Sequence, residues 1–316
     1  MSLIRFSGLT LLVIMAGVTV IAQTTAVDFN SQGITKANGG DPRGSIADYT
    51  KAITLDPSFV SAFTNRGSAY AAFGENAKAM ADFDHAISLK PDDWNAFSYR
   101  GELKQKLGDL DGAIADFSRV IAIVPWSDEY WKRARIRMIK GQLRAACADY
   151  TEMIRQDERE LNAGLFQLRG MVRHMSGNSP GALADFEAGL ACAKNDDDRA
   201  AIQLARYLVL KQSSRPEAAP ELAKLAGSWP EGWNKTLAQF LLGEVPDADF
   251  LKVAPDEDKE AQRSQCITHY YAGMRHLLAG EKGTALAYFK KSVATSADWD
   301  NEFAWSHGEI FLLTRP

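Results

Sequence analysis

The sequence predicts an all-α fold: a right-handed α-solenoid of helical hairpins with a helical C-terminal extension. The first observation is a tract, Ala-x-Ala-Asp followed by Phe or Tyr, at residues 79–83, 113–117, 146–150 and 182–186, with Ser replacing the first Ala at 45–49. The second is the spacing of its aspartates, at positions 48, 82, 116, 149 and 185, which is 34, 34, 33 and 36 residues. A period this regular indicates a repeat array.

The third observation is a pair of small-residue positions in every period. The first position holds Gly33, Gly67, Gly101, Ala134 and Gly170, and the second, seven residues later, holds Gly40, Gly74, Gly108, Gly141 and Gly177. A small residue within a helix lets a neighbouring helix approach, and a glycine ends a helix in the left-handed conformation. Pro57, Pro91 and Pro125 stop the following helix. Each period is therefore predicted to be two antiparallel helices, with the aromatic of the tract filling space against the next hairpin.

Charged residues follow the same period. Arg66, Arg100, Arg133 and Arg169 recur in phase with Asp82, Asp116, Asp149 and Asp185. An Arg–Asp pair in each repeat would fix the register of the helices through bidentate hydrogen bonds. The alternative is a row of arginines that binds an acidic ligand.

These positions resemble the tetratricopeptide repeat. In order, Phe63, Gly67, Tyr70, Gly74, Ala79, Phe83, Ala86 and Pro91 match the 34-residue pattern of that family. The resemblance implies five repeats within residues 23–195. The arginines at 100, 133 and 169 depart from the pattern, as does the lack of a closing proline in repeats four and five.

The first 22 residues predict an export signal. Arg5 gives a positive start, an uncharged apolar run extends from Leu9 to Ile21, and Ala22 ends a small-residue cleavage site. Cleavage would leave Gln23 first, and the protein would be periplasmic or secreted with no stable membrane span. The alternative is that the uncleaved segment anchors the chain in a membrane.

The C-terminal part loses the period and then recovers it. Residues 196–263 predict a helical connecting region. Residues 264–316 predict a sixth repeat-like hairpin, carried by Tyr270, Gly273, Gly280, Ala285, Phe289 and Ala294, and a capping helix over about 301–313. The order of residues 200–313 resembles bacterial NlpI-type envelope tetratricopeptide proteins, although the lipid-attachment cysteine is missing. That resemblance implies an adaptor that gathers envelope enzymes.

The composition and motifs do not indicate catalysis. The net charge is −4 and the pI is about 5.8, so no nucleic-acid partner is expected. The sequence contains no hydrolase, zinc-protease, dinucleotide or phosphate-loop motif, and we expect no enzyme activity, metal or cofactor. Of Cys147, Cys192 and Cys266, only the last two form a pair worth testing, and we expect them to be free. The oligomeric state does not follow from the sequence.

The resemblance implies a concave groove lined by the first helix of each repeat. Repeats two and three offer a small, polar half: Ser61, Thr64, Ser68, Ala71, Ala72, Asn95, Ser98, Glu102, Gln105 and Lys106. Of the lysines and asparagines that a carboxylate clamp for chaperone tails needs, only Asn65 fits. Repeats four and five offer an apolar half, and there we predict the partner-binding groove: Trp131, Arg135, Met138, Met171, His174 and Met175. The alternative is that the C-terminal part folds back over these residues.

Two functions follow as hypotheses. The first is a non-catalytic scaffold or adaptor of the bacterial cell envelope that binds a partner peptide or helix in the concave groove. The second is a periplasmic copper-binding protein that uses Met171, His174 and Met175 of repeat five, since these side chains lie about one turn apart and include soft ligands for Cu(I).

Overall fold

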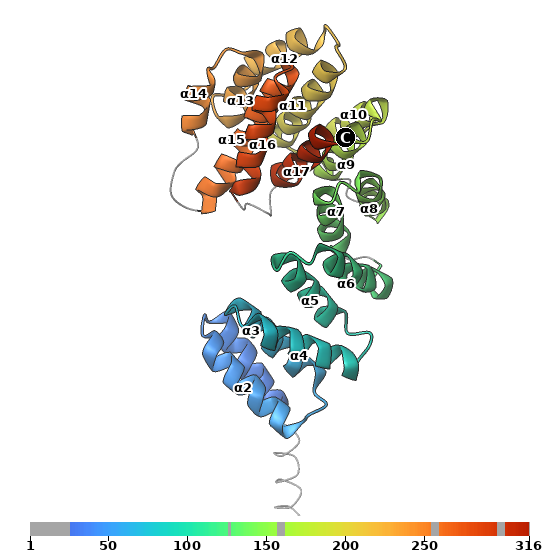
Figure 1. The fold of residues 1–316 in the computed structure, drawn as a ribbon, viewed down its shortest axis with the longest axis vertical. Helices are drawn as coiled ribbons and strands as arrows, with labels where there is room; N and C mark the ends of the chain where they lie inside the picture. The colour runs from blue at the N-terminus through green and yellow to red at the C-terminus, as the bar shows by residue number, and fades with distance from the viewer. Residues whose placement is uncertain (1–25, 126–127, 157–161, 254–258, 296–300, 316) are drawn as a thin grey trace, which may run out of the picture. The chain divides into compact units, whose positions relative to one another are not determined.

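The computed structural model describes residues 26–125, 128–156, 162–253, 259–295 and 301–315. Every regular element in these ranges is a helix, as predicted (Figure 1). The predicted export segment at residues 1–22 lies outside the described residues. None of the helices in the described ranges has the length and apolar character needed to cross a membrane. The chain divides into two compact units, one ending at Glu129 and one beginning at Tyr130.

The first unit consists of three helical hairpins. A helix over residues 26–38 pairs with α2 (Pro42–Leu55), α3 (Val60–Ala72) pairs with α4 (Asn76–Leu89), and α5 (Trp94–Lys106) pairs with α6 (Leu110–Ile123). Pro57, Pro91 and Pro125 each lie two residues beyond the end of a second helix, as predicted. At the turn inside the second hairpin, Gly74 has a φ of 76°, and the next amide, that of Glu75, bonds back to the Tyr70 carbonyl at 2.9 Å. This is the predicted glycine C-cap.

The aromatic of each tract packs within its own hairpin, which corrects the prediction that it mainly fills space against the next one. Phe83 and Phe117 are fully buried, and their rings lie against Gly67 and Gly101 on the preceding helix. Phe83 also contacts the following hairpin, where its ring centroid lies 6.2 Å from that of Tyr99. The small residue therefore leaves space for the aromatic ring and also lets the two helices pack closely.

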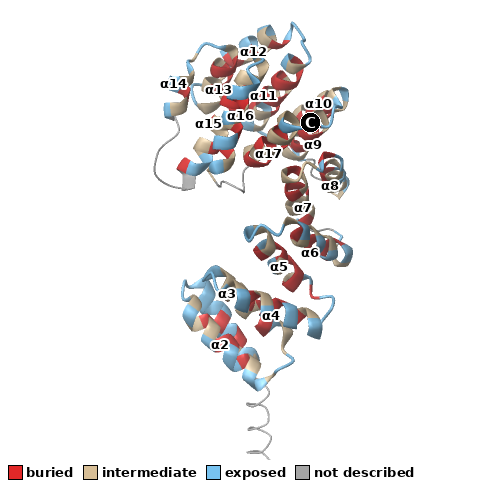
Figure 2. Cartoon of the chain, viewed as in Figure 1, coloured by how far each residue is buried: buried red, intermediate tan, exposed pale blue. Residues whose placement is uncertain are grey.

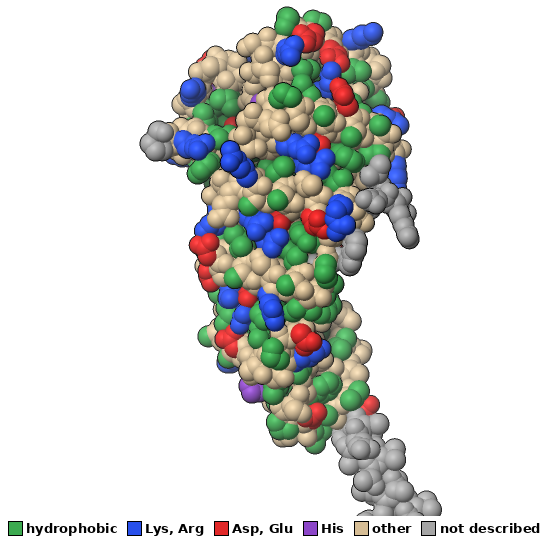
Figure 3. Space-filling model, turned by 90° about the vertical axis from the view of Figure 1, so that its right-hand side faces the viewer, with side chains coloured by type: hydrophobic (Ala, Val, Ile, Leu, Met, Phe, Trp, Pro, Cys, Tyr) green, Lys and Arg blue, Asp and Glu red, His purple; other side chains and the backbone are tan. Residues whose placement is uncertain are grey.

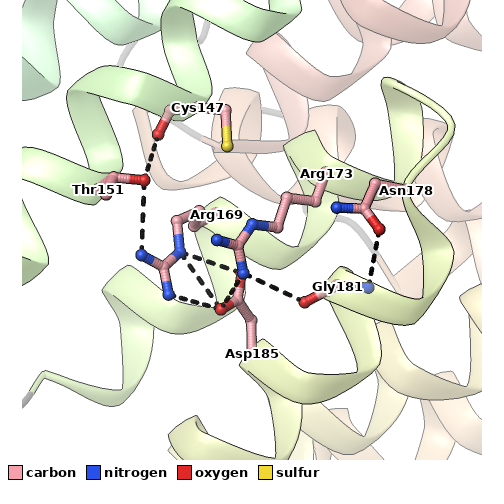
Figure 4. A network of polar contacts seen from close by, with 7 residues as sticks. All are labelled: Cys147, Thr151, Arg169, Arg173, Asn178, Gly181 and Asp185. Carbon is pink, nitrogen blue, oxygen red and sulfur yellow. Dashed lines mark hydrogen bonds and ion pairs between the residues drawn. The ribbon is translucent and has the colours of Figure 1, made fainter.

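The predicted Arg–Asp pairs are confirmed. Arg100 Nε and Nη2 donate to the two carboxylate oxygens of Asp116 at 2.9 and 2.7 Å, and Lys104 approaches the same carboxylate at 2.8 Å. Figure 4 shows the equivalent group in the fifth repeat, where Arg169 and Arg173 both contact Asp185. Because every aspartate of this set is buried and paired within its repeat, the row holds the two helices of each hairpin in register.

The second unit contains the remaining helices. Its hairpins are α7 (Glu129–Ile139) with α8 (Leu143–Gln156) and α9 (Ala163–Met175) with α10 (Ser179–Cys192). There follow α11 (Asp196–Gln212), α12 (Ala218–Gly227), α13 (Trp233–Leu242), α14 (Asp247–Phe250), a 3₁₀ turn η1 (Leu251–Val253), α15 (Lys259–Leu278), α16 (Lys282–Ala294) and α17 (Asn301–Thr314). In the hairpin of α15 and α16, Phe289 packs over Gly273 as Phe83 packs over Gly67.

One hydrophobic cluster joins most of the second unit. It runs from α7 to α17, and Figure 2 shows buried residues on the facing sides of these helices. Helix α17 packs against α15 and α16, and also against α9 of repeat five. Its Gly308 lies against the Met175 sulfur, and its Phe311 lies against Gly141 at the end of α7. All three cysteines are free, so Cys192 and Cys266 do not pair.

Candidate functional site

The groove predicted on repeats four and five is not an open surface. Met138, Met171 and Met175 are at most 5% exposed, Arg135 is 3% exposed, and Trp131 and His174 are partly buried. The three methionines belong to the main hydrophobic cluster of the second unit, against which Trp131 also packs. The prediction of an exposed apolar patch was therefore wrong, because these side chains form the core of the unit.

Later parts of the chain bury these residues. Helices α11 and α17 both pack on α9, which carries Met171, His174 and Met175. Gln167 Nε2 of α9 donates to the Ala201 carbonyl of α11 at 3.0 Å, so α11 is held directly on this face. The Arg135 guanidinium carbon lies 4.6 Å from the Trp131 ring centroid, a stacking contact inside the unit. The alternative drawn from the sequence, a C-terminal part folded over the patch, describes what is observed.

The structure does not favour the copper alternative. The Nδ1 atom of His174 lies 2.9 Å from Ser179 Oγ, and Nε2 is hydrogen-bonded to Gln212 Oε1, so both ring nitrogens are engaged. Burial lowers the pKa of this imidazole despite the Gln212 contact. No cluster of three or more His, Cys, Asp or Glu side chains suited to a metal ion occurs in the described ranges.

An open pocket lies instead on the first unit. It has a volume of about 290 Å³ and is lined by residues from the first helices of its three hairpins: Asn30, Ile34, Ser61, Thr64, Asn65, Asp93, Asn95 and Tyr99. Three of these, Ser61, Thr64 and Asn95, are among the groove residues predicted for the polar half. The structure thus brings part of that half together in one concave site.

The pocket has a connected polar wall. Asn65 Nδ2 donates to Asn30 Oδ1 at 3.0 Å, and Thr64 Oγ1 donates to Asp93 Oδ2 at 3.0 Å. Asn30, Thr64 and Asp93 are each 7% exposed or less, so these groups are held rigidly. Tyr99 and Ile34, at 38% and 40% exposed, supply apolar surface beside them. The site can therefore offer both hydrogen bonds and apolar contact to an extended chain.

Some of these residues were missed from the sequence. The sequence analysis did not assign four of them to the groove: Asn30, Ile34, Asp93 and Tyr99. For Asp93, however, the sequence contains a pattern that recurs with the repeat. Thr64 and Ser98 lie 34 residues apart, and each donates to a buried acid further along the chain, Asp93 and Glu129 respectively. A hydroxyl recurring with the repeat and followed by an acid could have identified this position.

Two larger hollows lie on the second unit. One, of about 710 Å³, lies at the turn after α7 and includes Phe311 and Arg315. The other, of about 530 Å³, is lined by Trp229, Trp233 and the acidic first turn of α11. Over the face drawn in Figure 3, basic and acidic side chains are interspersed. Neither hollow has the network of buried polar side chains seen in the first unit.

Comparison with known proteins supports the repeat architecture. Residues 60–93 match a family described as tetratricopeptide repeat, and this segment spans α3 and α4, the central hairpin of the first unit. No curated protein sequence matches the chain.

Solved structures share the fold. A tetratricopeptide repeat protein from Parabacteroides merdae matches at 14% identity with a TM-score of 0.53, over 92% of this chain and all of that one. MamA matches at 22% identity with a TM-score of 0.47, over 54% of this chain and 92% of that chain. YrrB, described as a TPR protein with an unusual peptide-binding site, matches at 18% identity with a TM-score of 0.45, over 56% of this chain and 90% of that chain. The first of these shows a stacked helical-hairpin fold along most of the chain.

Proposed function

We propose that this protein is a non-catalytic scaffold that binds an extended protein segment in the concave pocket of its first unit. The observation that carries the proposal is the open, rigid polar wall made by Asn30, Thr64, Asn65 and Asp93. Hydrogen-bonding groups set beside apolar surface are the features that recognise an extended peptide.

The contrast between the two units supports this choice of site. The equivalent face of repeats four and five is filled by the chain's own helices, whereas exposed large apolar side chains in the described residues, such as Ile34, Trp94 and Tyr99, lie on the first unit. The hairpin that matches the tetratricopeptide repeat contributes Ser61, Thr64 and Asn65 to the pocket. A partner would therefore meet accessible surface here without displacing any described helix of the first unit.

Selection from a random peptide library tests the proposal. Phage-displayed dodecapeptides would be selected on the purified chain and then measured against the variant Ser61→Trp. Ser61 is exposed at the pocket, so the indole should fill the site without disturbing the core. We expect peptides that bind the native chain and lose binding to this variant, while the melting temperature stays the same. Peptides that bind both proteins equally, or a selection that yields none, would reject this site.

A role in the bacterial cell envelope is a separate part of the proposal. It rests on the export signal predicted at residues 1–22 and on the resemblance of residues 200–313 to envelope adaptors, which would make envelope enzymes the partners. N-terminal sequencing of the protein from a periplasmic or secreted fraction should begin at or near Gln23. Recovery of only the full-length chain from a membrane pellet would favour the anchored alternative.

A further inference from the structure

The pocket of the first unit carries one buried carboxylate, Asp93, that makes no ion pair with a described residue. Asp93 is 7% exposed and occupies the residue just before α5, a position where an aspartate ordinarily caps the helix with its side chain. Its side chain makes no such capping bond. Instead, Oδ2 accepts a hydrogen bond from Thr64 on the preceding hairpin, and the carboxylate lines the pocket.

No basic side chain neutralises this carboxylate within the part of the chain that the structure describes. This distinguishes it from the other buried aspartates of the first unit: Asp48 and Asp116 each contact a lysine or an arginine, and so does Asp82. Asp93 is also the sole ionisable carboxylate or base among the pocket-lining residues, since the others are amides, hydroxyls, an isoleucine and a tyrosine. A buried carboxylate is stabilised when a cation with hydrogen-bond donors reaches it.

The remaining polar groups suit the same ligand. The Nδ2 group of Asn65 donates to Asn30 Oδ1, and no described residue donates to Asn65 Oδ1, so this oxygen can accept a hydrogen bond from a ligand that has only donors. Asn95 and Ser61 add further oxygens and donors on neighbouring helices. Beside them, the exposed Tyr99 ring and the Ile34 side chain can cover the methylene stem of a long side chain, and an aromatic face attracts a cation.

We propose that this pocket binds a basic side chain, with arginine preferred over lysine, from the extended segment that occupies the groove. The guanidinium would pair with Asp93, and its outer N–H groups would reach the side-chain oxygens of the asparagines. A planar guanidinium presents several donors in a fixed fork, which suits a carboxylate flanked by amides better than an ammonium does. An acidic side chain or a terminal carboxylate would be excluded, because it would meet Asp93 with no lysine or arginine in the wall. This inference rests on the proposed function.

Three peptide sets test the inference. Octapeptides with randomised flanks would carry arginine, its neutral isostere citrulline or glutamate at a fixed central position, and their binding to the purified full chain would be measured by fluorescence polarisation. We expect the arginine set to bind at least about tenfold more tightly than the citrulline set, the difference that a charge-assisted hydrogen bond supplies. The glutamate set should bind more weakly than the citrulline set.

Two variants locate the preference. Asp93→Asn keeps an oxygen for the Thr64 hydrogen bond and removes the charge, so it should bind the arginine and citrulline sets equally with an unchanged melting temperature. Asp92→Asn removes an exposed neighbouring charge outside the pocket lining and should keep the arginine preference. An arginine preference that survives in Asp93→Asn, or tightest binding of the glutamate set, would overturn the inference.

The outcomes separate this inference from the proposed function. If all three sets bind alike and Ser61→Trp abolishes their binding, the groove binds peptides but does not select a basic side chain. If no set binds the native chain, both the peptide-binding function and this inference are rejected.

Discussion

Phe83 lies so close to Gly67 that a β-carbon on residue 67 would be 2.7 Å from the ring atom Cε1. Real β-carbons do not approach a neighbour this closely, so either the ring or the helix must move if residue 67 gains a methyl group. The same contact recurs between Gly101 and Phe117 and between Gly170 and Phe186. In these three repeats, one glycine–phenylalanine pair thus sets how near the two helices of the hairpin stand.

Gly67→Ala should therefore destabilise the first unit. Overpacking of a buried site costs about 1–3 kcal/mol in the free energy of unfolding, although alanine gains about 1 kcal/mol over glycine in helix propensity. Phe83→Leu removes the ring edge that clashes, so Gly67→Ala should cost less in that background. Urea unfolding of the four proteins of this cycle measures the coupling between the two residues. Additive costs would show that the ring is not the obstacle.

The contribution of each Arg–Asp pair to the free energy of unfolding should depend on how deeply the pair is buried. Asp116→Ala removes a buried carboxylate that holds both Arg100 and Lys104, and we expect a loss of about 3 kcal/mol in unfolding free energy. Asp84→Ala is the matched control, since Asp84 contacts the same arginine at 2.6 Å but is 58% exposed. An exposed pair of this kind contributes about 0–1 kcal/mol. Chemical denaturation measures both changes, and equal losses would contradict the argument.

Local rules explain how much of the fold could be predicted. Gly74, Pro91 and the Arg100–Asp116 pair each act inside a single hairpin or at its end, so their effect on structure follows from spacing along the chain. The regular period then extended that local result to the whole array. The contact between Phe83 and Gly67 was harder to predict from the sequence, because spacing alone did not indicate which neighbouring helix the ring would contact.

The site could not be predicted in the same way. Met171 and Met175 have the pattern expected of a groove, and only the docking of α11 and α17 turns them into core. The contact between Met175 and Gly308 joins residues far apart in sequence, after the regular period has been interrupted. In the first unit, by contrast, Ser61 stays exposed at the pocket, and Thr64, although buried by the following hairpin, still lines the pocket beside Asp93.

This difference between the units gives a direct test with Trp131→Ala and Met171→Ala combined. Met171 is 1% exposed, and a buried Met→Ala substitution costs about 2–5 kcal/mol. We therefore expect the double variant to melt several degrees earlier and still capture peptides through the pocket of the first unit. Ser61→Trp should show the opposite behaviour, an unchanged melting temperature and lost capture. A double variant with unchanged stability and lost capture would instead place the binding site on repeats four and five.

The pH dependence of stability should be visible at Glu309 on α17. This side chain is 4% exposed, and burial raises the pKa of its carboxyl from 4.5 to about 7. The folded state therefore holds a proton that the unfolded state releases between these two pH values. The unfolded state binds fewer protons there, so the free energy of unfolding falls as pH rises from about 4.5 to 7 and then levels off.

Glu309→Gln should remove this pH dependence, because the neutral amide resembles the protonated acid. Each pH unit of that interval corresponds to about 1.4 kcal/mol in the free energy of unfolding. The free energy of unfolding of the variant should therefore exceed that of the native chain by up to about 3 kcal/mol at pH 8. The two values should be equal near pH 4.5. Denaturant unfolding at the two pH values measures the difference. The control is Glu187→Gln on α10, an exposed position, which should leave the free energy of unfolding unchanged at both pH values. If Glu309→Gln is equally stabilising at both pH values, the buried carboxyl of Glu309 is not the group that titrates.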